Sequence, residues 1–274
     1  MRFAPLPSRA HGAALAAALA ALGLALARPQ LAALPLAAFL FACATAPFFP
    51  SWQFFLPVIC HGPRGRPAVA LTFDDGPDPR VIDRLLALLE SSRAPATFFV
   101  VGERVEAHPA LLDRIAAAGH EIGNHTQTHD VFLALRSMRR LEREVAVCQE
   151  LLTRHGIVPR VFRPPVGITN PRFLRILARH RLACVGFSCR PLDFGNRRIE
   201  RLAERVLRRV RDGDVILLHD GCPEEAVAEP WLDQLAAILA GLRSRGLEVV
   251  PLSDLLDIPV TERLSPEAKR ALLT

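Results

Sequence analysis

The chain has 274 residues, half of them hydrophobic, and a formal net charge of +6 at pH 7. This length accommodates one domain of roughly 200 residues with an attached segment. The charge comes almost wholly from arginine and is not accompanied by base-reading or stacking residues, so no nucleic-acid partner is expected. The six cysteines have no CxxC or framework spacing, which argues against structural zinc and a disulfide scaffold and favours buried thiols.

Two apolar runs occupy the N-terminal quarter, from Gly12 through Ala27 and from Leu31 through Phe49. The second is long enough to cross a bilayer, whereas the first reaches only about 24 Å and is marginal. The first run is therefore either a signal-peptide core with a cleavage site at Ala25-Leu26-Ala27, or the partner of the second run in a helical hairpin. We expect residues 1–60 to anchor the protein in a bacterial-type inner membrane through contact with lipid, and residues 61–67 to form a linker.

The side of the membrane on which the remaining chain lies is left open by the charges. Arg2 and Arg9 favour a cytoplasmic start, and a two-span hairpin would return the chain to the cytoplasm beside Arg64 and Arg66. A single span would instead leave it outside.

From residue 68 onward, short apolar runs typical of strands alternate with amphipathic stretches of helical length. This alternation predicts an α/β fold with a parallel sheet, and about seven such units favour a complete or incomplete barrel over residues 68–257, followed by a tail over 258–274. In such a barrel, functional groups gather where the strands end. The predicted helices are Arg80–Ser91, Glu103–Ala118, Leu135–Arg154, Pro171–Arg181, Arg197–Arg211 and Trp231–Arg245.

Two adjacent carboxylates, Asp74 and Asp75, end an apolar run immediately before Gly76-Pro77. Neighbouring side chains on a strand point in opposite directions, so one acid can bind a metal while the other faces the substrate as a general base. An ordinary Asp-Gly turn after a strand is the alternative.

His125 and His129 are four residues apart, a spacing that places both imidazoles on one face of a helical turn. Taken alone, such a pair can be a coincidence of surface or core. Together with Asp75 it would form a two-histidine, one-carboxylate set of metal ligands with open positions for water or substrate.

Three further polar groups end or follow strand-like runs. They are Arg163 in the turn Arg163–Gly167, Asp193 beyond Phe187-Ser188, and His219 after Val215–Leu218. Because a random scatter would not fall repeatedly at this boundary, we expect these side chains to converge in one catalytic site.

These segments resemble, in order, the five signature motifs of the polysaccharide deacetylases, the NodB-homology enzymes of carbohydrate esterase family 4. The resemblance spans roughly Ala68–Leu256 and implies a distorted (β/α) barrel and a metal-dependent hydrolase that removes N-acetyl groups from amino sugars. The motifs are Thr72–Pro77, His125–His129, Arg163–Gly167, Asp193-Phe194 and Leu217–His219.

The resemblance implies a role for each motif. Asp74 would be the catalytic base, and Asp75, His125 and His129 would hold a divalent metal, usually Zn²⁺, which activates the attacking water. Arg163 would fix Asp74.

His219 would be the acid that protonates the leaving amine, and Asp193 would orient His219 and keep it charged. Leu217 and Phe194 would line the pocket for the acetyl methyl group. A backbone N–H near Val166 would stabilise the oxyanion.

Three residues depart from the family pattern. Val166 replaces a usual aromatic residue whose backbone is the functional part, and Phe194 replaces a usual Trp, which keeps an apolar wall but removes a donor. Arg190 stands where the family often has an acid, and it could compete for Asp193 or Asp74.

Two alternatives to the deacetylase therefore remain open. One is an inactive glycan-binding pseudo-enzyme, and the other is an Fe(II) oxygenase, which would leave Asp74 and His219 without a task. The expected partner is an N-acetylated glycan or glycolipid. The resemblance favours the envelope side of the membrane for the catalytic domain.

Overall fold

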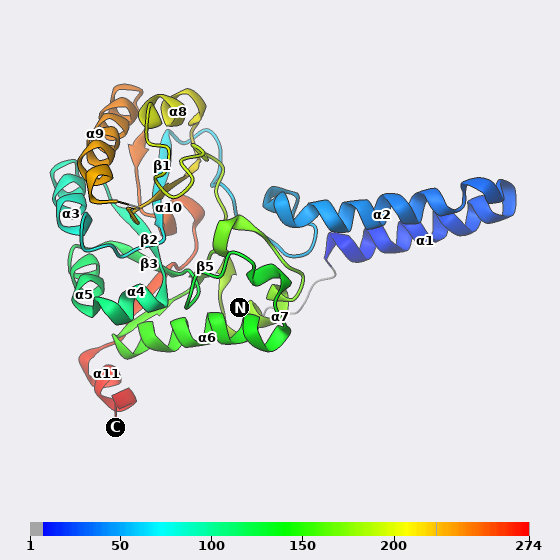
Figure 1. Ribbon diagram of the computed structural model, residues 1–274, viewed down its shortest axis with the longest axis horizontal. Coiled ribbons are helices and arrows are strands. Elements are labelled where there is room, and N and C mark those ends of the chain that lie inside the picture. The colour runs from blue at the N-terminus through cyan, green and yellow to red at the C-terminus, as the bar shows by residue number, and fades with distance from the viewer. Residues whose placement is uncertain (1–7, 223, 274) are drawn as a thin grey trace.

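The computed structural model describes residues 8–222 and 224–273, and its main body is a curled parallel sheet surrounded by helices (Figure 1). The strand order is β6-β5-β3-β2-β1-β7, and β8 also pairs with β1. All these pairings are parallel. The strands are β1 (Ala68–Asp74), β2 (Ala96–Val100), β3 (Glu121–Asn124), β5 (Val161–Phe162), β6 (Ala183–Cys184), β7 (Val215–His219) and β8 (Glu248–Val249).

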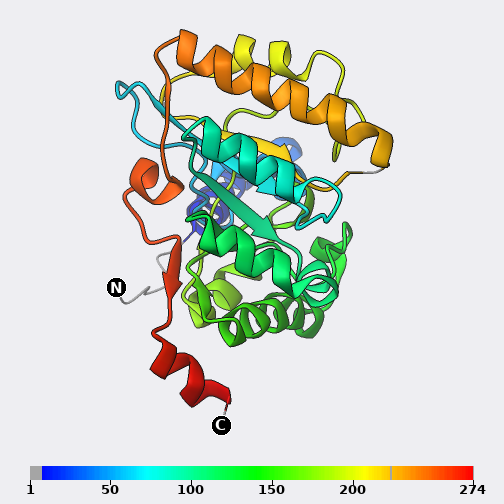
Figure 2. The same cartoon turned by 90° about the vertical axis from the view of Figure 1, so that its left-hand side faces the viewer.

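The helices lie outside this sheet, with α9, α3 and α5 along one side and α6 beneath (Figures 1 and 2). Trp231 on α9 is fully buried and packs edge-on against Phe73 of β1. The helices of the domain are α3 (Ile82–Ser91), α4 (Gly102–Ala107), α5 (Pro109–Ala117), α6 (Met138–Arg154), α7 (Phe173–His180), α8 (Leu202–Arg209), α9 (Ala228–Ser244) and α10 (Leu252–Leu256).

The predicted α/β fold with about seven strands is confirmed as a half-barrel. Between its two sheet edges lie isolated bridges, one of them a parallel bridge between Cys189 and Ile216. The single helix predicted over Glu103–Ala118 is wrong, because it is two helices separated at His108. Pro109 causes the break, since proline has no N–H and disfavours helical geometry in the residue before it.

The alternation of side chains along β1 positions the catalytic residues. Val69, Leu71 and Phe73 pack in the large apolar core under the helices, whereas Ala68 and Ala70 belong to a separate cluster on the other face. With a period of two, the second face continues through Thr72 to Asp74. Asp74 therefore ends the strand facing the interior of the half-barrel.

The N-terminal helices α1 (Arg9–Ala27) and α2 (Ala33–Thr45) lie side by side and project away from the domain (Figure 1). Their apolar side chains are largely exposed. The segments 9–27 and 29–48 have the length and composition of membrane spans, a property that signal sequences share.

The C-terminal residues are attached to the barrel domain. Strand β9 (Thr261–Arg263) pairs antiparallel with β4 (Ile157–Pro159), and α11 (Pro266–Leu273) follows. The predicted tail over 258–274 thus contributes a strand and a helix to the fold in its described part.

Candidate active site

The two neighbouring acids leave β1 in different directions. Asp74 is the last strand residue and lies in register with His219 on the adjacent strand β7. Asp75 follows with φ 72°, a left-handed conformation that turns its side chain away from the strand's alternation. The structure thus brings the predicted base and the predicted acid onto neighbouring strands.

Asp75, His125 and His129 form a cluster that could hold a metal ion. One potential ligand atom from each lies within 4.8 Å of the others. The Asp75 Oδ1 atom is 3.1 Å from His129 Nε2 and 3.5 Å from His125 Nε2. This oxygen is buried and makes no hydrogen bond, so a cation placed among the three residues would supply its missing partner. The cluster therefore fits a divalent ion with two nitrogen ligands and one oxygen ligand.

Burial and neighbouring charges favour the protonation states in which Asp75 and His129 can bind a metal. Burial raises the pKa of the Asp75 carboxyl, but His125, His129 and His219 outweigh it and hold that pKa below its usual range. Burial lowers the pKa of His129 to about 4, which keeps its imidazole neutral and its nitrogen lone pair available. The His125 Nδ1 atom is 2.8 Å from the Arg163 carbonyl oxygen, a contact that directs Nε2 toward Asp75.

The expected helical turn at His125–His129 is wrong. The segment is a loop after β3, in which Thr126 (φ 71°) and His129 (φ 53°) adopt left-handed conformations. Buried Glu144 on α6 fixes this loop by accepting hydrogen bonds from the backbone amides of Gln127 (3.1 Å) and Thr128 (2.8 Å). The two histidines converge because of this loop geometry and not because of helical periodicity.

Arg163 forms a buried ion pair with Asp74. The fully buried guanidinium donates from Nη1 to Asp74 Oδ1 at 2.6 Å and to Thr72 Oγ1 at 2.9 Å. It also donates to the Gly186 carbonyl at 2.8 Å and stacks 3.9 Å from the Phe99 ring centroid. These contacts leave Asp74 Oδ2 facing the cluster, 3.8 Å from His125 Nε2.

His219 is paired with buried Asp193. The His219 Nδ1 atom lies 2.7 Å from Asp193 Oδ2. Burial lowers the pKa of His219, but the hydrogen bond and charge of Asp193 outweigh it and raise that pKa to about 9. The imidazole is therefore protonated at neutral pH, as an acid toward a leaving amine must be.

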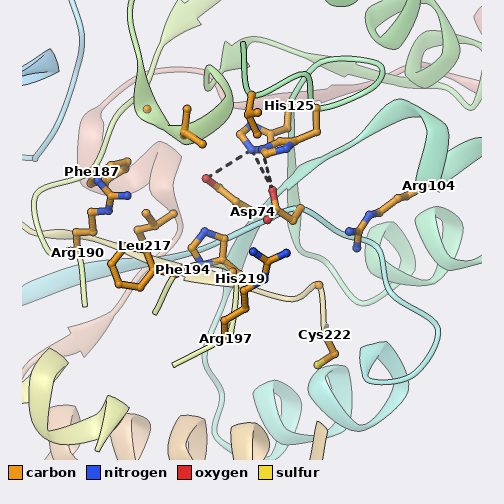
Figure 3. A pocket seen from close by; sticks show the side chains of 17 residues that line it. Asp74, Arg104, His125, Phe187, Arg190, Phe194, Arg197, Leu217, His219 and Cys222 are labelled. Atoms are coloured by element: carbon orange, nitrogen blue, oxygen red, sulfur yellow. Dashed lines mark ion pairs between the residues drawn. The ribbon is translucent and has the colours of Figure 1, made fainter. Parts of the chain in front are cut away.

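A cavity of about 410 Å³ is lined by Asp74, Asp75, His125, His129 and His219 (Figure 3). Its apolar wall includes Val166, Phe194 and Leu217, the three pocket residues expected from the sequence. Arg190 also lines the cavity. It makes no ion pair with Asp193 or Asp74, and its guanidinium lies 5.6 Å from the Phe187 ring centroid instead.

Sequence reasoning missed Glu144, Arg104, Arg197 and Asp220. Arg104 and Arg197 line the cavity, and Asp220 is completely buried beside it. The signal for Glu144 was available, because an acid among Leu141, Val145 and Cys148 stands on the buried face of an amphipathic helix. Arg197 stands in an arginine-rich segment and Arg104 is an isolated arginine of a predicted helix, so neither gave such a signal.

A sequence model of the polysaccharide deacetylase family matches residues 61–185. A chitooligosaccharide deacetylase of Sinorhizobium fredii is 39% identical over 189 residues, which cover 65% of this chain and 85% of that protein. The chain belongs to the polysaccharide deacetylase family.

Other members of the family support the assignment. A peptidoglycan-N-acetylglucosamine deacetylase of Bacillus cereus is 34% identical over 71% of this chain and 90% of its own length. The crystal structure of a peptidoglycan N-acetylglucosamine deacetylase, Bc1960, superimposes with a TM-score of 0.70 at 31% identity over 78% of this chain and 98% of that one. The prediction of an amide-hydrolysing enzyme of this family is confirmed. A pseudoenzyme from Bacillus anthracis shares the fold at 22% identity and a TM-score of 0.65.

Proposed function

We propose that this enzyme hydrolyses the N-acetyl group of an amino sugar in an N-acetylated glycan or glycolipid, with a divalent ion, Zn²⁺ in the first instance, held by Asp75, His125 and His129. The observation that carries the proposal is the pairing of Asp74 with Arg163 and of His219 with Asp193 beside this cluster. A base and an acid thus accompany a ligand set suited to a metal.

The ion would polarise the acetyl carbonyl and lower the pKa of water beside it. Asp74 Oδ2, left free by Arg163, accepts the proton of the attacking water. His219 donates its proton to the amide nitrogen as the C–N bond breaks, which yields acetate and a free amine. Asp193 stabilises the charged imidazole before transfer.

A backbone donor for the oxyanion is available at Val166. The Gly167 amide already donates to the Pro164 carbonyl at 3.0 Å, which leaves the Val166 amide as the candidate. Val166 has φ 51°, a strained conformation for a β-branched residue, and such strain is common where a backbone group serves function.

The alternatives explain less of the site. For Arg190 to inactivate the site, its guanidinium would have to pair with Asp193 or Asp74. Asp74 instead pairs with Arg163, and Asp193 pairs with His219. An Fe(II) oxygenase has no use for a paired base and a protonated histidine.

Acetate release from a panel of N-acetylated glycans, with and without chelator, tests this function. Asp74→Asn is expected to abolish turnover and keep the metal, whereas His125→Ala is expected to lose the metal. Normal turnover in Asp74→Asn would disprove the base assignment.

We further propose that the hairpin of α1 and α2 spans the membrane and that the domain lies on the cytoplasmic side. The hairpin returns the chain to the side on which it enters, with Arg9, Arg64 and Arg66 there and Arg28 at the opposite turn, a distribution that favours the cytoplasm. All six cysteines are unpaired, which suits a reducing compartment. These features outweigh the envelope location that the resemblance favoured.

Fusions of alkaline phosphatase and of β-galactosidase to the C-terminus test this orientation. Activity of the β-galactosidase fusion alone supports the cytoplasmic side, and activity of the phosphatase fusion alone refutes it.

A further inference from the structure

The exposed apolar side chains of the domain gather around the cavity. Among the described residues beyond Trp52, the large hydrophobic side chains that are exposed are Val131, Phe132, Leu135, Val166, Leu192 and Phe194. Three of them, Val131, Val166 and Phe194, line the cavity. Phe132 is 61% exposed and Leu135 is 82% exposed in the adjoining loop. Single exposed apolar residues are ordinary, but their concentration at one site marks a surface that contacts something apolar.

These exposed apolar residues form a rim around the cavity, and hydrogen bonds connect this rim to the base of the helical hairpin. The Thr169 amide, three residues after Val166, donates at 3.0 Å to the carbonyl of Pro47, two residues beyond the end of α2. The neighbouring Asn170 side chain donates to the Ala134 carbonyl at 2.6 Å, in the loop that carries Phe132 and Leu135. A hairpin that crosses the bilayer therefore brings the rim close to the lipid surface.

Aromatic residues mark where that surface would lie. Phe49 and Trp52 stack with ring centroids 4.7 Å apart at the junction of hairpin and domain, and both are exposed. Aromatic side chains favour the boundary between lipid and water.

Two exposed arginines at the cavity lack a carboxylate partner. Arg190 and Arg197 both line the cavity and form no ion pair with any carboxylate that the structure describes. Figure 3 shows Arg190 beside Phe187 and Arg197 beside His219, so the two guanidinium groups approach the cavity from different loop positions. Unpaired guanidinium groups at a cavity mouth suit a phosphate on the ligand.

We propose that the substrate is the amino-sugar head group of an anionic membrane lipid, in which phosphate joins the N-acetylated sugar to a hydrocarbon chain. Phe132, Leu135 and Val131 contact the lipid surface, Arg190 and Arg197 bind the phosphate, and the sugar enters the cavity. This inference rests on the proposed deacetylase function, whose substrate class it narrows.

The full-length enzyme in phosphatidylcholine vesicles tests the proposal with three probes that share N-acetylglucosamine. These are the sugar linked by diphosphate to a polyprenol, soluble N-acetylglucosamine 1-phosphate, and chitotetraose. Acetate release is expected to be at least about tenfold more efficient, in kcat/KM, with the lipid-linked probe than with either soluble one.

Two sets of variants separate the contributions of lipid and phosphate. Phe132→Ser combined with Leu135→Ser is expected to lower kcat/KM about tenfold for the lipid-linked probe and to change that for N-acetylglucosamine 1-phosphate far less. Arg197→Gln is expected to raise KM for both phosphate-bearing probes and not for chitotetraose. Arg208→Gln, on the exposed face of α8, is the matched control and is expected to change neither value.

The possible failures are distinguishable. Acetate release from none of the three probes counts against the deacetylase function itself. Efficient release from chitotetraose with no effect of the Phe132 and Leu135 substitutions overturns the lipid-linked substrate and leaves the deacetylase intact. A preference for soluble N-acetylglucosamine 1-phosphate that depends on Arg197 alone overturns it equally, because the site would then recognise phosphate without lipid.

Discussion

The pairing of Asp193 with His219 gives the sharpest prediction about the chemistry. Asp193→Asn keeps the size of the side chain and an oxygen that can accept a hydrogen bond from Nδ1, but it removes the charge. Burial, which lowers the pKa of His219, remains. The pKa is therefore expected to fall from about 9 toward its ordinary value of 6.5, a change of up to about 2.5 units or about 3 kcal/mol.

This change has two measurable consequences. At pH 7.5 the protonated fraction of His219 falls from more than about nine-tenths to about one-tenth, so turnover should drop roughly tenfold through protonation alone. The alkaline limb of the kcat/KM profile should also move from near pH 9 toward pH 6.5.

Stability should respond with the same sign. The folded-state pKa of His219 lies above its unfolded value, so its stabilising effect is fully present below about pH 6.5 and is lost as the pH rises toward 9. Asp193→Asn should flatten this dependence.

The assay is acetate release between pH 5 and 10, together with NMR titration of the His219 ring. Glu204→Gln, an exposed acid on α8 paired with Arg201, is the control and should leave the profile unchanged. An alkaline limb that stays near pH 9 in Asp193→Asn would refute the reasoning, since the proton would then come from another group.

Three further predictions concern the groups that hold the site. Arg163→Leu leaves buried Asp74 without its partner and should lower the free energy of unfolding by about 3–5 kcal/mol, measured by urea denaturation. A loss below about 1 kcal/mol would contradict a buried ion pair. Glu144→Ala removes the acceptor for two loop amides and should weaken Zn²⁺ affinity about 10–100-fold, measured by titration with a competing chelator. Unchanged affinity would show that the loop keeps its conformation without Glu144. Burial raises the pKa of Asp220 from 3.8 to about 8, so folding takes up a proton and the free energy of unfolding falls as the pH rises through this interval. Asp220→Asn should remove the decline between pH 5 and pH 6.5, which lies below the range in which His219 contributes, and denaturation at these two pH values would show a persisting decline if another group is responsible.

The sequence determined the chemical inventory and its order along the chain. Asp74, Arg163 and His219 could be assigned because each ends or follows an apolar strand, and parallel strands deliver their carboxyl ends to one edge of a sheet. The N-terminal apolar runs were equally plain, because some 20 consecutive apolar residues have few soluble explanations.

Tertiary structure alone decided how these residues meet. The histidine pair converges through left-handed residues in a loop fixed by Glu144, which lies on a distant helix that local spacing cannot reveal. The approach of the Val166 turn to Pro47, and with it the link between cavity rim and hairpin, depends on contacts between residues more than 100 positions apart. Periodicity reports which face of an element is buried, but it carries no information about which distant loop will lie against that face, because packing of the whole chain selects the neighbour.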